Sequence, residues 1–159
     1  MKRLLALLLC LLCAPALAAC GTGAQKSAET QLANPFADYD SLAEAEAAAG
    51  FSLAAPTSID GCSGPDVQLM SGKMLQLIFR SDSGRIIIRK AAGSEDISGD
   101  YTSYAETKTA RVNGCDVTLK GADGKVSTAV WCANGYSYAL LSDVPMATDI
   151  LTDLIVEIA

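Results

Sequence analysis

The feature that most restricts the fold of this chain is a series of short β-type segments between residues 67 and 141. Most are rich in apolar residues, and turn-forming Ser, Asp and Gly lie between several of them. The segments are 67–70, 74–79, 85–90, 111–120, 126–132 and 136–141. A further brief strand is expected at 51–53. Because short turns join antiparallel neighbours, the pattern predicts a meandering antiparallel sheet of about six strands.

A helix is predicted at each end of this sheet. Ser41 and Glu44 have the spacing of a capping box and Gly50 supplies a stop, so a short helix is expected at 42–49. Near the C-terminus, apolar residues recur at helical spacing opposite a row of acids. The apolar positions are Met146, Ile150, Leu151, Leu154, Ile155 and Ile158. The predicted fold is α+β, a single domain in which an N-terminal and a C-terminal helix pack on one face of the sheet.

The start of the chain has the organisation of a secretory leader. Two basic residues precede an apolar run at 4–12, which is too short to span a bilayer. Residues 17–20, LAAC, match the lipobox, in which cleavage before Cys20 leaves a thiol that carries diacylglycerol. The alternative is ordinary cleavage after Ala18, which would give a freely secreted protein. We expect residues 1–19 to be a lipoprotein signal peptide.

After cleavage, residues 20–35 would be a lipidated cysteine with a flexible tether, and residues 36–159 would form the extracytoplasmic domain. Loss of the leader removes two basic and no acidic side chains, which changes the net charge from −6 to −8. A surface this acidic is a poor partner for nucleic acid or for membrane phosphates. We therefore expect no nucleic-acid partner, and attachment to the cell membrane through the lipid on Cys20.

Three cysteines remain in the predicted domain. The Asp-Gly dipeptide at 123–124 is typical of a two-residue hairpin turn, and counting outward from it sets Cys115 opposite Cys132. Their Cα atoms would lie about 4.5 Å apart, a separation that a disulfide accepts. A three-residue loop would instead set Cys115 opposite Trp131, and two buried free thiols are a further alternative. Cys62 would be a free thiol, an intermolecular partner or a buried residue.

The segment 89–101, RKAAGSEDISGDY, concentrates charged groups among glycines and serines. Glu95, Asp96 and Asp100 are weak candidates for a ligand or Ca²⁺ site. Their spacing lacks the alternating ligand pattern of an EF-hand loop, so no metal site is predicted.

A structural role for the same segment is the favoured interpretation. Asp and Ser side chains bond to backbone N–H groups in turns, and glycines supply positive φ angles. Ile97 and Tyr101 are expected to point inward. Arg89 and Lys90 are expected to form a solvated strand end that pairs weakly with the neighbouring acids.

The composition argues against an enzyme. The chain contains no histidine, which removes His-dependent nucleophiles and His metal ligands, and no Ser–Lys spacing is evident. We expect no catalytic residues and no cofactor; a carboxylate-dependent hydrolase that uses Asp96 or Asp100 is the less favoured alternative. The aromatic residues are expected in the core or rim of the sheet, the alternative being a shallow groove for peptide or glycan. They are Tyr101, Tyr104, Trp131, Tyr136 and Tyr138.

Three stretches resemble a known family. They are NPFADYDSLAEAEAAAGFSLAAP at 34–56, IIIRKAAGSEDISGDY at 86–101 and VTLKGADGKVSTAVWCANGYSYAL at 117–140, the second being the most specific. The chain resembles uncharacterised bacterial lipoproteins, mainly of Gram-positive gut-type anaerobes, whose shared domain has no assigned function. A related domain is attached to some anti-sigma-factor-like membrane proteins. The resemblance implies a lipid-anchored, extracytoplasmic α+β domain without catalytic residues. Cys132 departs from the family, where a polar residue is expected.

These features predict a binding or sensing module at the cell envelope, on the extracytoplasmic face of the cell membrane. Its ligand would be an envelope protein, a peptide or a glycan. The alternative is a structural or inhibitory partner of another envelope protein.

Overall fold

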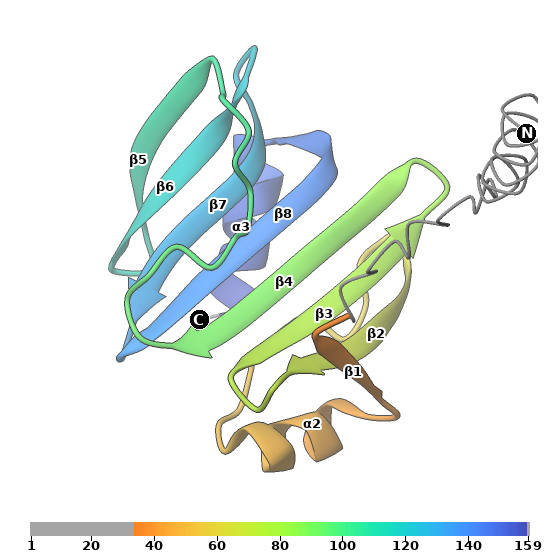
Figure 1. Ribbon diagram of the computed structural model, residues 1–159. Coiled ribbons are helices and arrows are strands. Elements are labelled where there is room, and N and C mark those ends of the chain that lie inside the picture. Colours follow the sequence, from red (N-terminus) through yellow and green to blue (C-terminus); the bar gives the residue numbers. More distant parts are fainter. Residues whose placement is uncertain (1–33, 159) are drawn as a thin grey trace, which may run out of the picture. The chain divides into compact units, whose positions relative to one another are not determined.

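The computed structural model describes residues 34–158 (Figure 1). The predicted signal peptide, Cys20 and most of the predicted tether lie outside the described residues. In chain order the elements are β1 (Phe36–Tyr39), α2 (Leu42–Ala49), β2 (Ser63–Met70), β3 (Met74–Ser81), β4 (Gly84–Ala92), β5 (Glu106–Val112), β6 (Cys115–Ala122), β7 (Lys125–Ala133), β8 (Tyr136–Ala147) and α3 (Thr148–Ile158).

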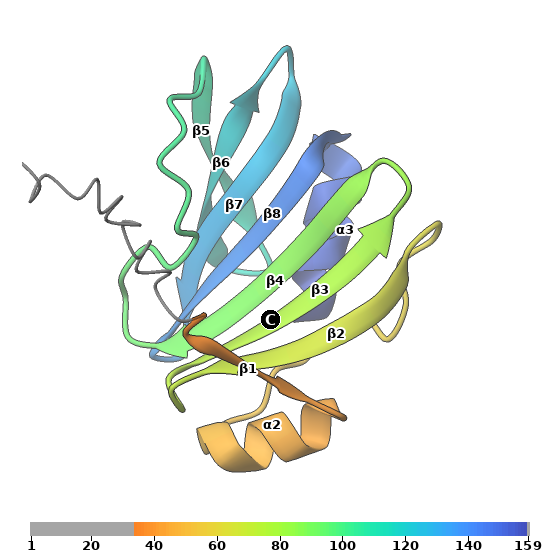
Figure 2. The same ribbon diagram turned by 45° about the vertical axis from the view of Figure 1, so that its right-hand side comes forward.

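The strands form one antiparallel sheet of eight strands in the order β1-β2-β3-β4-β8-β7-β6-β5. The first four strands form one meander and the last four form a second (Figure 2). The two meanders join where β4 pairs with β8, so β5 lies at the far edge of the sheet instead of beside β4. The predicted α+β class and the single domain are confirmed. The predicted number of about six strands is wrong.

Two features account for the additional strands. The four residues of β1, FADY, pair with β2 but contain no apolar run that would mark a strand in the sequence. The segment 111–120, predicted as one strand, contains a turn at Asn113 and Gly114, where φ is 47° and 79°. Positive φ at both central residues is what a two-residue hairpin turn requires. The chain therefore reverses there, and β5 and β6 are separate strands.

Helix α2 forms where the capping pattern predicted it. The Oγ of Ser41 accepts a hydrogen bond at 3.3 Å from a backbone N–H of the first turn, and Gly50 ends the helix with a φ of 78°. The brief strand expected at 51–53 does not form. Instead, the N–H of Leu53 donates to Oε1 of Glu46 at 2.6 Å, and the Leu53 side chain is buried in the core.

Helix α3 begins two residues later than predicted, because Met146 still belongs to β8. Its buried positions agree with the predicted apolar face and are Leu151, Ile155 and Ile158. Ile150, which was assigned to the same face, is 55% exposed. It lies at the margin of the contact with the sheet.

The sheet separates an inner face, which carries the hydrophobic core, from an outer face. Residues that are directly paired across antiparallel strands point to the same side, so the strand register identifies each face. One row on the inner face is fully or almost fully buried and consists of Leu77, Ile88, Leu140, Ala129 and Leu119. A matching row on the outer face consists of Gln76, Arg89, Ala139, Val130 and Thr118. Side chains of both helices belong to the inner core.

The predicted turn at 123–124 is confirmed, because the residues that flank it are paired and both turn residues have positive φ. Beyond the turn, however, β7 contains an extra residue, Ser127. This β-bulge shifts the pairing by one position, so that Lys120 lies opposite Thr128. A shift of one residue exchanges the faces of every side chain that follows.

The bulge overturns the register on which the Cys115–Cys132 disulfide was predicted. Val117 pairs with Trp131 on the inner face, which places Cys115 on the inner face and Cys132 on the outer face. All three cysteines of the described domain are free thiols. Cys62 and Cys115 pack partly buried against the core, as small apolar side chains do, and Cys132 is exposed.

Candidate functional site

The acid-rich segment of the sequence crosses the outer face of the sheet. We call residues 93–105 the strap: it links β4 to β5 and contains neither helix nor strand (Figure 1). Because β5 lies at the far edge, the strap has to pass over the intervening strands of the second meander. Its backbone groups have no strand ladder and need other partners.

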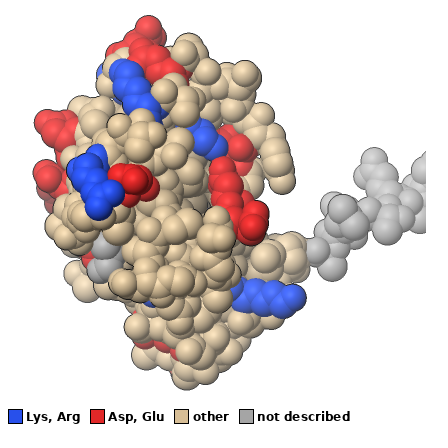
Figure 3. All heavy atoms as spheres, turned by 90° about the vertical axis from the view of Figure 1, so that its left-hand side faces the viewer, with Lys and Arg blue, Asp and Glu red and all other residues tan. Residues whose placement is uncertain are grey.

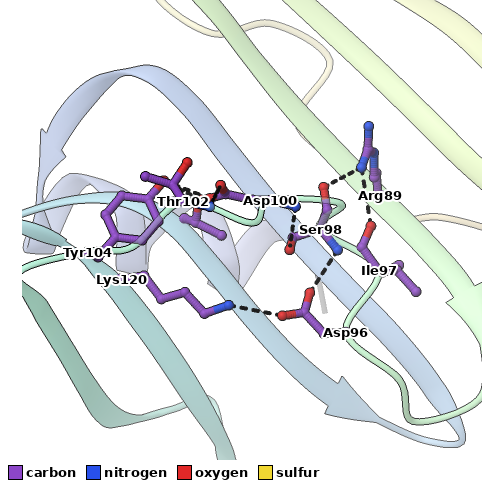
Figure 4. A network of polar contacts seen from close by, with 9 residues as sticks. Arg89, Asp96, Ile97, Ser98, Asp100, Thr102, Tyr104 and Lys120 are labelled. Carbon is purple, nitrogen blue, oxygen red and sulfur yellow. Dashed lines mark hydrogen bonds and ion pairs between the residues drawn. The ribbon is translucent and has the colours of Figure 1, made fainter.

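Asp100 fastens the strap to β7. Its Oδ2 accepts hydrogen bonds from the hydroxyls of Thr128 and Tyr104, each at 2.6 Å, and its Oδ1 accepts from the N–H of Thr102 at 3.0 Å (Figure 4). Partial burial acts to raise the pKa of the Asp100 carboxyl. The hydrogen bonds outweigh burial and hold this pKa well below its usual range. Asp100 is therefore a charged anchor whose two oxygens are occupied by protein donors.

Asp96 makes a second attachment, to β6. Its Oδ1 accepts from the N–H of Ser98 at 2.9 Å, and its Oδ2 accepts from Nζ of Lys120 at 3.0 Å (Figure 4). Partial burial acts to raise the pKa of Asp96, but the contacts with Ser98 and Lys120 prevail and lower it. The Oγ of Ser98 in turn accepts from the N–H of Asp100 at 3.2 Å, which connects the two attachments.

Arg89 makes a third attachment from the strand beneath the strap. Its Nη1 donates to the carbonyl oxygens of Ile97, at 3.2 Å, and Ser98 (Figure 4). Its Nε donates to Oε1 of Gln76 at 2.7 Å. The guanidinium is half-buried, and burial lowers its pKa, although a guanidinium stays protonated in proteins. The prediction that Arg89 is part of a solvated strand end is therefore wrong.

Arg89 also ends a row of polar side chains that crosses four strands of the outer face. Gln76 Nε2 donates to Oε1 of Gln68 at 2.7 Å, and Gln68 Nε2 donates to Oδ1 of Asp38 at 2.8 Å. A guanidinium can only donate and a carboxylate can only accept, so each glutamine amide between them has one possible orientation. We call Asp38, Gln68, Gln76 and Arg89 the polar ladder; it connects β1 to the strap.

Lys90 points to the inner face, because successive residues of a strand alternate in direction. It is 9% exposed, and its Nζ donates to the carbonyl oxygen of Ser52 at 2.7 Å. The ammonium lies 4.3 Å and 5.1 Å from the ring centroids of Tyr136 and Tyr138, and 5.8 Å from that of Phe51. These are cation–π contacts that tie the loop after α2 to the sheet. The predicted solvated position is wrong for Lys90 as well, and this residue is not part of the strap face.

The three candidate carboxylates are not gathered into a metal site. Asp96 and Asp100 use both oxygens for protein donors, and Glu95 is exposed. Within residues 34–158, no three His, Cys, Asp or Glu side chains are close enough together to hold a metal ion. A general acid needs a pKa raised toward neutrality, whereas the pKa values of Asp96 and Asp100 are lowered. The lowered pKa values therefore argue against Asp96 and Asp100 as the general acid of the hydrolase alternative.

Tyr101 projects from the strap into solvent. It is 98% exposed, so the prediction that it points inward is wrong, whereas Ile97 is half-buried. The hydrogen bond from the N–H of Thr102 to Asp100 closes an Asx turn with Tyr101 at its centre, which directs this residue away from the sheet. Of the other aromatic residues of the predicted set, Trp131, Tyr136 and Tyr138 lie in the core or at its rim, and Trp131 and Tyr138 stack with ring centroids 5.2 Å apart. Tyr104 lies in the strap, where its hydroxyl donates to Asp100.

Two depressions lie beside the strap. One has a volume of about 460 Å³, and its lining includes Gly99, Asp100, Thr102 and Tyr104 of the strap, Ile87, Leu141 and an ion pair of 2.8 Å between Arg85 and Asp143. The other has a volume of about 480 Å³, and its lining includes Ser94, Glu95, Asp96, Thr118, Val130 and the exposed Cys132. Both mix apolar and polar groups. We call the strap, which includes Tyr101, together with these two depressions the strap face.

Several residues that build this face were not singled out in the sequence. They are Asp38, Gln68, Gln76, Lys120 and Thr128. Each lies on a strand, separated by many residues from its partner, and only the strand order brings them together. A glutamine within an apolar strand, as Gln76 is in β3, is the one local signal that could have indicated a buried polar contact.

Comparison of the chain with protein-family models, with curated proteins and with solved structures gave no match. Neither of the two helices in the described part of the chain is long and apolar enough to cross a membrane.

Proposed function

We propose that this chain is a lipid-anchored binding module on the extracytoplasmic face of the cell membrane, and that the strap face is its binding surface. The location is supported by the leader at 1–19 and by the lipobox, which ends in Cys20. The polar segment that follows is long enough to hold the domain away from the bilayer.

The observation that carries the binding role is the contrast between the strap and its most prominent side chain. Asp96, Asp100 and Arg89 hold the strap against three different strands, yet Tyr101 has 98% of its surface in water. Tyrosine is enriched at interfaces, because its ring offers a large apolar surface and its hydroxyl a polar contact. A fixed loop with one exposed ring is suited to recognition.

The polar ladder supports the same role, because it makes the domain a firm connection between anchor and binding surface. β1 directly follows the predicted tether, and the ladder joins β1 through β2 and β3 to Arg89 and hence to the strap. Each bond in the ladder is 2.7 or 2.8 Å long. The strap is thus connected to β1, the strand that follows the predicted tether in the sequence.

The location is tested by following lipid on the chain in a bacterial host. We expect the wild-type chain to incorporate an alkyne-labelled fatty acid, to sediment with membranes and to accumulate as a precursor when globomycin blocks lipoprotein signal peptidase. Cys20→Ala should abolish lipid incorporation. Cys13→Ala is the matched control, because this cysteine lies inside the leader and outside the lipobox, and it should incorporate lipid normally. Recovery of an unlabelled, processed wild-type chain from the medium would contradict the proposal.

A further inference from the structure

We infer that the strap face receives a folded protein partner and that Tyr101 is the anchor residue of this contact. The inference rests on the proposed function of a binding module and deepens it by assigning the class of partner and the residue that contacts it.

Tyr101 differs from the other exposed large apolar side chains of the described domain. Val144, Ile150 and Val156 are 44%, 55% and 52% exposed, so each is still about half covered by its own domain. Tyr101 is 98% exposed. A tyrosine ring that enters a partner's pocket buries roughly 150–250 Å² of surface, and tyrosine is among the residues that dominate protein–protein binding energy. The whole ring of Tyr101 is thus free for a partner.

The strap is already ordered before any partner binds. Its attachments at Asp96, Asp100 and Arg89 fix the backbone on both sides of Tyr101, and the Asx turn sets the direction of the residue itself. Ordering a loop on association usually weakens binding, so a loop fixed in advance retains more of the contact energy. A partner surface of fixed shape gains most from a loop that is ordered in advance.

The composition of the strap favours a protein over a glycan or a small molecule. Its sequence, GSEDISGDYTSYA, combines tyrosine with serine, threonine and glycine, as the antigen-contacting loops of antibodies do. The groups that could orient a sugar are already committed: Asp96, Asp100, Arg89 and Lys120 all bond within the chain. What remains exposed is an aromatic ring, small polar groups, backbone and the carboxylate of Glu95.

Charge defines the partner further. The strap carries three carboxylates, and of these only Asp96 forms an ion pair, with Lys120. By contrast, the β5 side of the domain shows acidic and basic side chains next to one another (Figure 3). There Lys108 pairs with Glu106 at 2.6 Å and Arg111 with Asp116 at 2.7 Å. The strap therefore keeps a negative charge that the β5 edge does not. The expected partner surface has a pocket for one aromatic ring, with basic groups at its rim.

The inference is tested by photocrosslinking on living cells. The lipidated full-length chain is expressed in its own host with p-benzoylphenylalanine in place of Tyr101 or, as the control, in place of Ile150, which is exposed on α3. We expect one protein adduct of defined mass from position 101 and none of that mass from position 150. The adduct is identified by mass spectrometry and the captured protein is purified.

Binding of the purified protein to the strap variants then decides the role of Tyr101. Tyr101→Ala should weaken binding at least about tenfold, as truncation of an interface anchor does, while its unfolding midpoint stays at the wild-type value. Ile150→Ala should change binding less than twofold. Glu95→Gln should weaken binding about two- to fivefold, and less at high salt, as expected for a rim charge.

The following results of the crosslinking or binding experiments would overturn the inference. Equal adducts from both positions, or binding unchanged by Tyr101→Ala, would place the contact elsewhere and leave the binding module intact. Adducts on glycan or lipid alone would exclude a protein partner. The absence of adducts from both positions, on a chain shown to carry lipid at Cys20, would count against the inference and the binding module together, whereas the location would stand.

Discussion

Replacement of Asp100 by asparagine removes one charge from the strap and keeps the shape of the side chain. In the wild-type domain the carboxylate accepts three hydrogen bonds, from the hydroxyls of Thr128 and Tyr104 at 2.6 Å and from the N–H of Thr102 at 3.0 Å. Asparagine can keep the bond from Thr102 through its oxygen. Its NH₂ group cannot accept a hydrogen bond from either hydroxyl. The hydroxyls of Thr128 and Tyr104, which lie 3.2 Å apart, then have to bond to each other or accept a hydrogen bond from the amide.

The expected loss of stability follows from these contacts. A hydrogen bond to a charged group contributes about 1.5–3 kcal/mol where it is buried. Asp100 is only half-buried and the hydroxyls find partial substitutes, so we expect Asp100→Asn to lower the free energy of unfolding by about 1–2 kcal/mol at pH 7.

The difference between the two chains should also depend on pH. Because the folded-state pKa of Asp100 lies below the unfolded value of about 3.9, the carboxylate stabilises the fold above that value. This contribution is lost as pH falls below about 4 toward the folded-state pKa. Asparagine does not titrate, so the gap between wild type and Asp100→Asn should be largest near pH 7. It should narrow progressively below about pH 4.

The measurement is equilibrium urea unfolding of residues 20–159, at several pH values between 7 and 2. Asp82→Asn is the matched control, since this exposed carboxylate lies in the turn between β3 and β4, and it should stay within about 0.5 kcal/mol of wild type. A gap for Asp100→Asn no larger than that of the control at pH 7, or a gap that stays constant down to pH 2, would refute the role of Asp100 as a charged anchor.

Three further predictions concern the polar ladder, the bulge and the thiols. Gln76→Leu replaces a side chain that is 4% exposed and removes one hydrogen bond each from the half-buried Gln68 and Arg89, so it should destabilise the domain by about 1–3 kcal/mol in urea; a change below about 0.5 kcal/mol would argue against the ladder. Gly121→Ala would place a Cβ 1.9 Å from the carbonyl oxygen of Lys125, so it should lower the thermal midpoint by several degrees, and an unchanged midpoint would show that the bulge relaxes freely. Under native conditions an alkylating reagent should label the exposed Cys132 before the partly buried Cys115, as read by peptide mass; a cross-linked pair of these cysteines in the unreduced protein would show that our register is wrong.

The sequence allowed the α+β class, both helices and most of the strands to be predicted, because these depend on local patterns. The capping residue Ser41 and the glycine after α2 indicated that helix directly. The turn at 123–124 was predicted correctly for the same reason. The turn at Asn113 and Gly114 has the same chemistry, and reading it as part of one long strand was an error of interpretation.

Prediction of the candidate site was less successful. The segment 89–101 contributes most of the strap, and Asp96 and Asp100 do satisfy local backbone groups, as the favoured interpretation expected. Arg89, Lys90 and Tyr101 were all placed wrongly. Their positions depend on which face of β4 is covered and on where the strap crosses the sheet, and these follow from the pairing of β4 with β8, more than forty residues later in the chain.

What the sequence determined by itself is therefore the fold class, both helices and most of the strands, since each depends on residues a few positions apart. What only the tertiary structure decided is the order of the strands and the faces of their side chains. One extra residue in β7 turned Cys132 away from Cys115. Because β4 pairs with β8 and not with β5, the strap crosses the outer face with Tyr101 in solvent. The physical reason is that a strand alternates its side chains at every residue, so a bulge or a change of neighbour reassigns each of them at once.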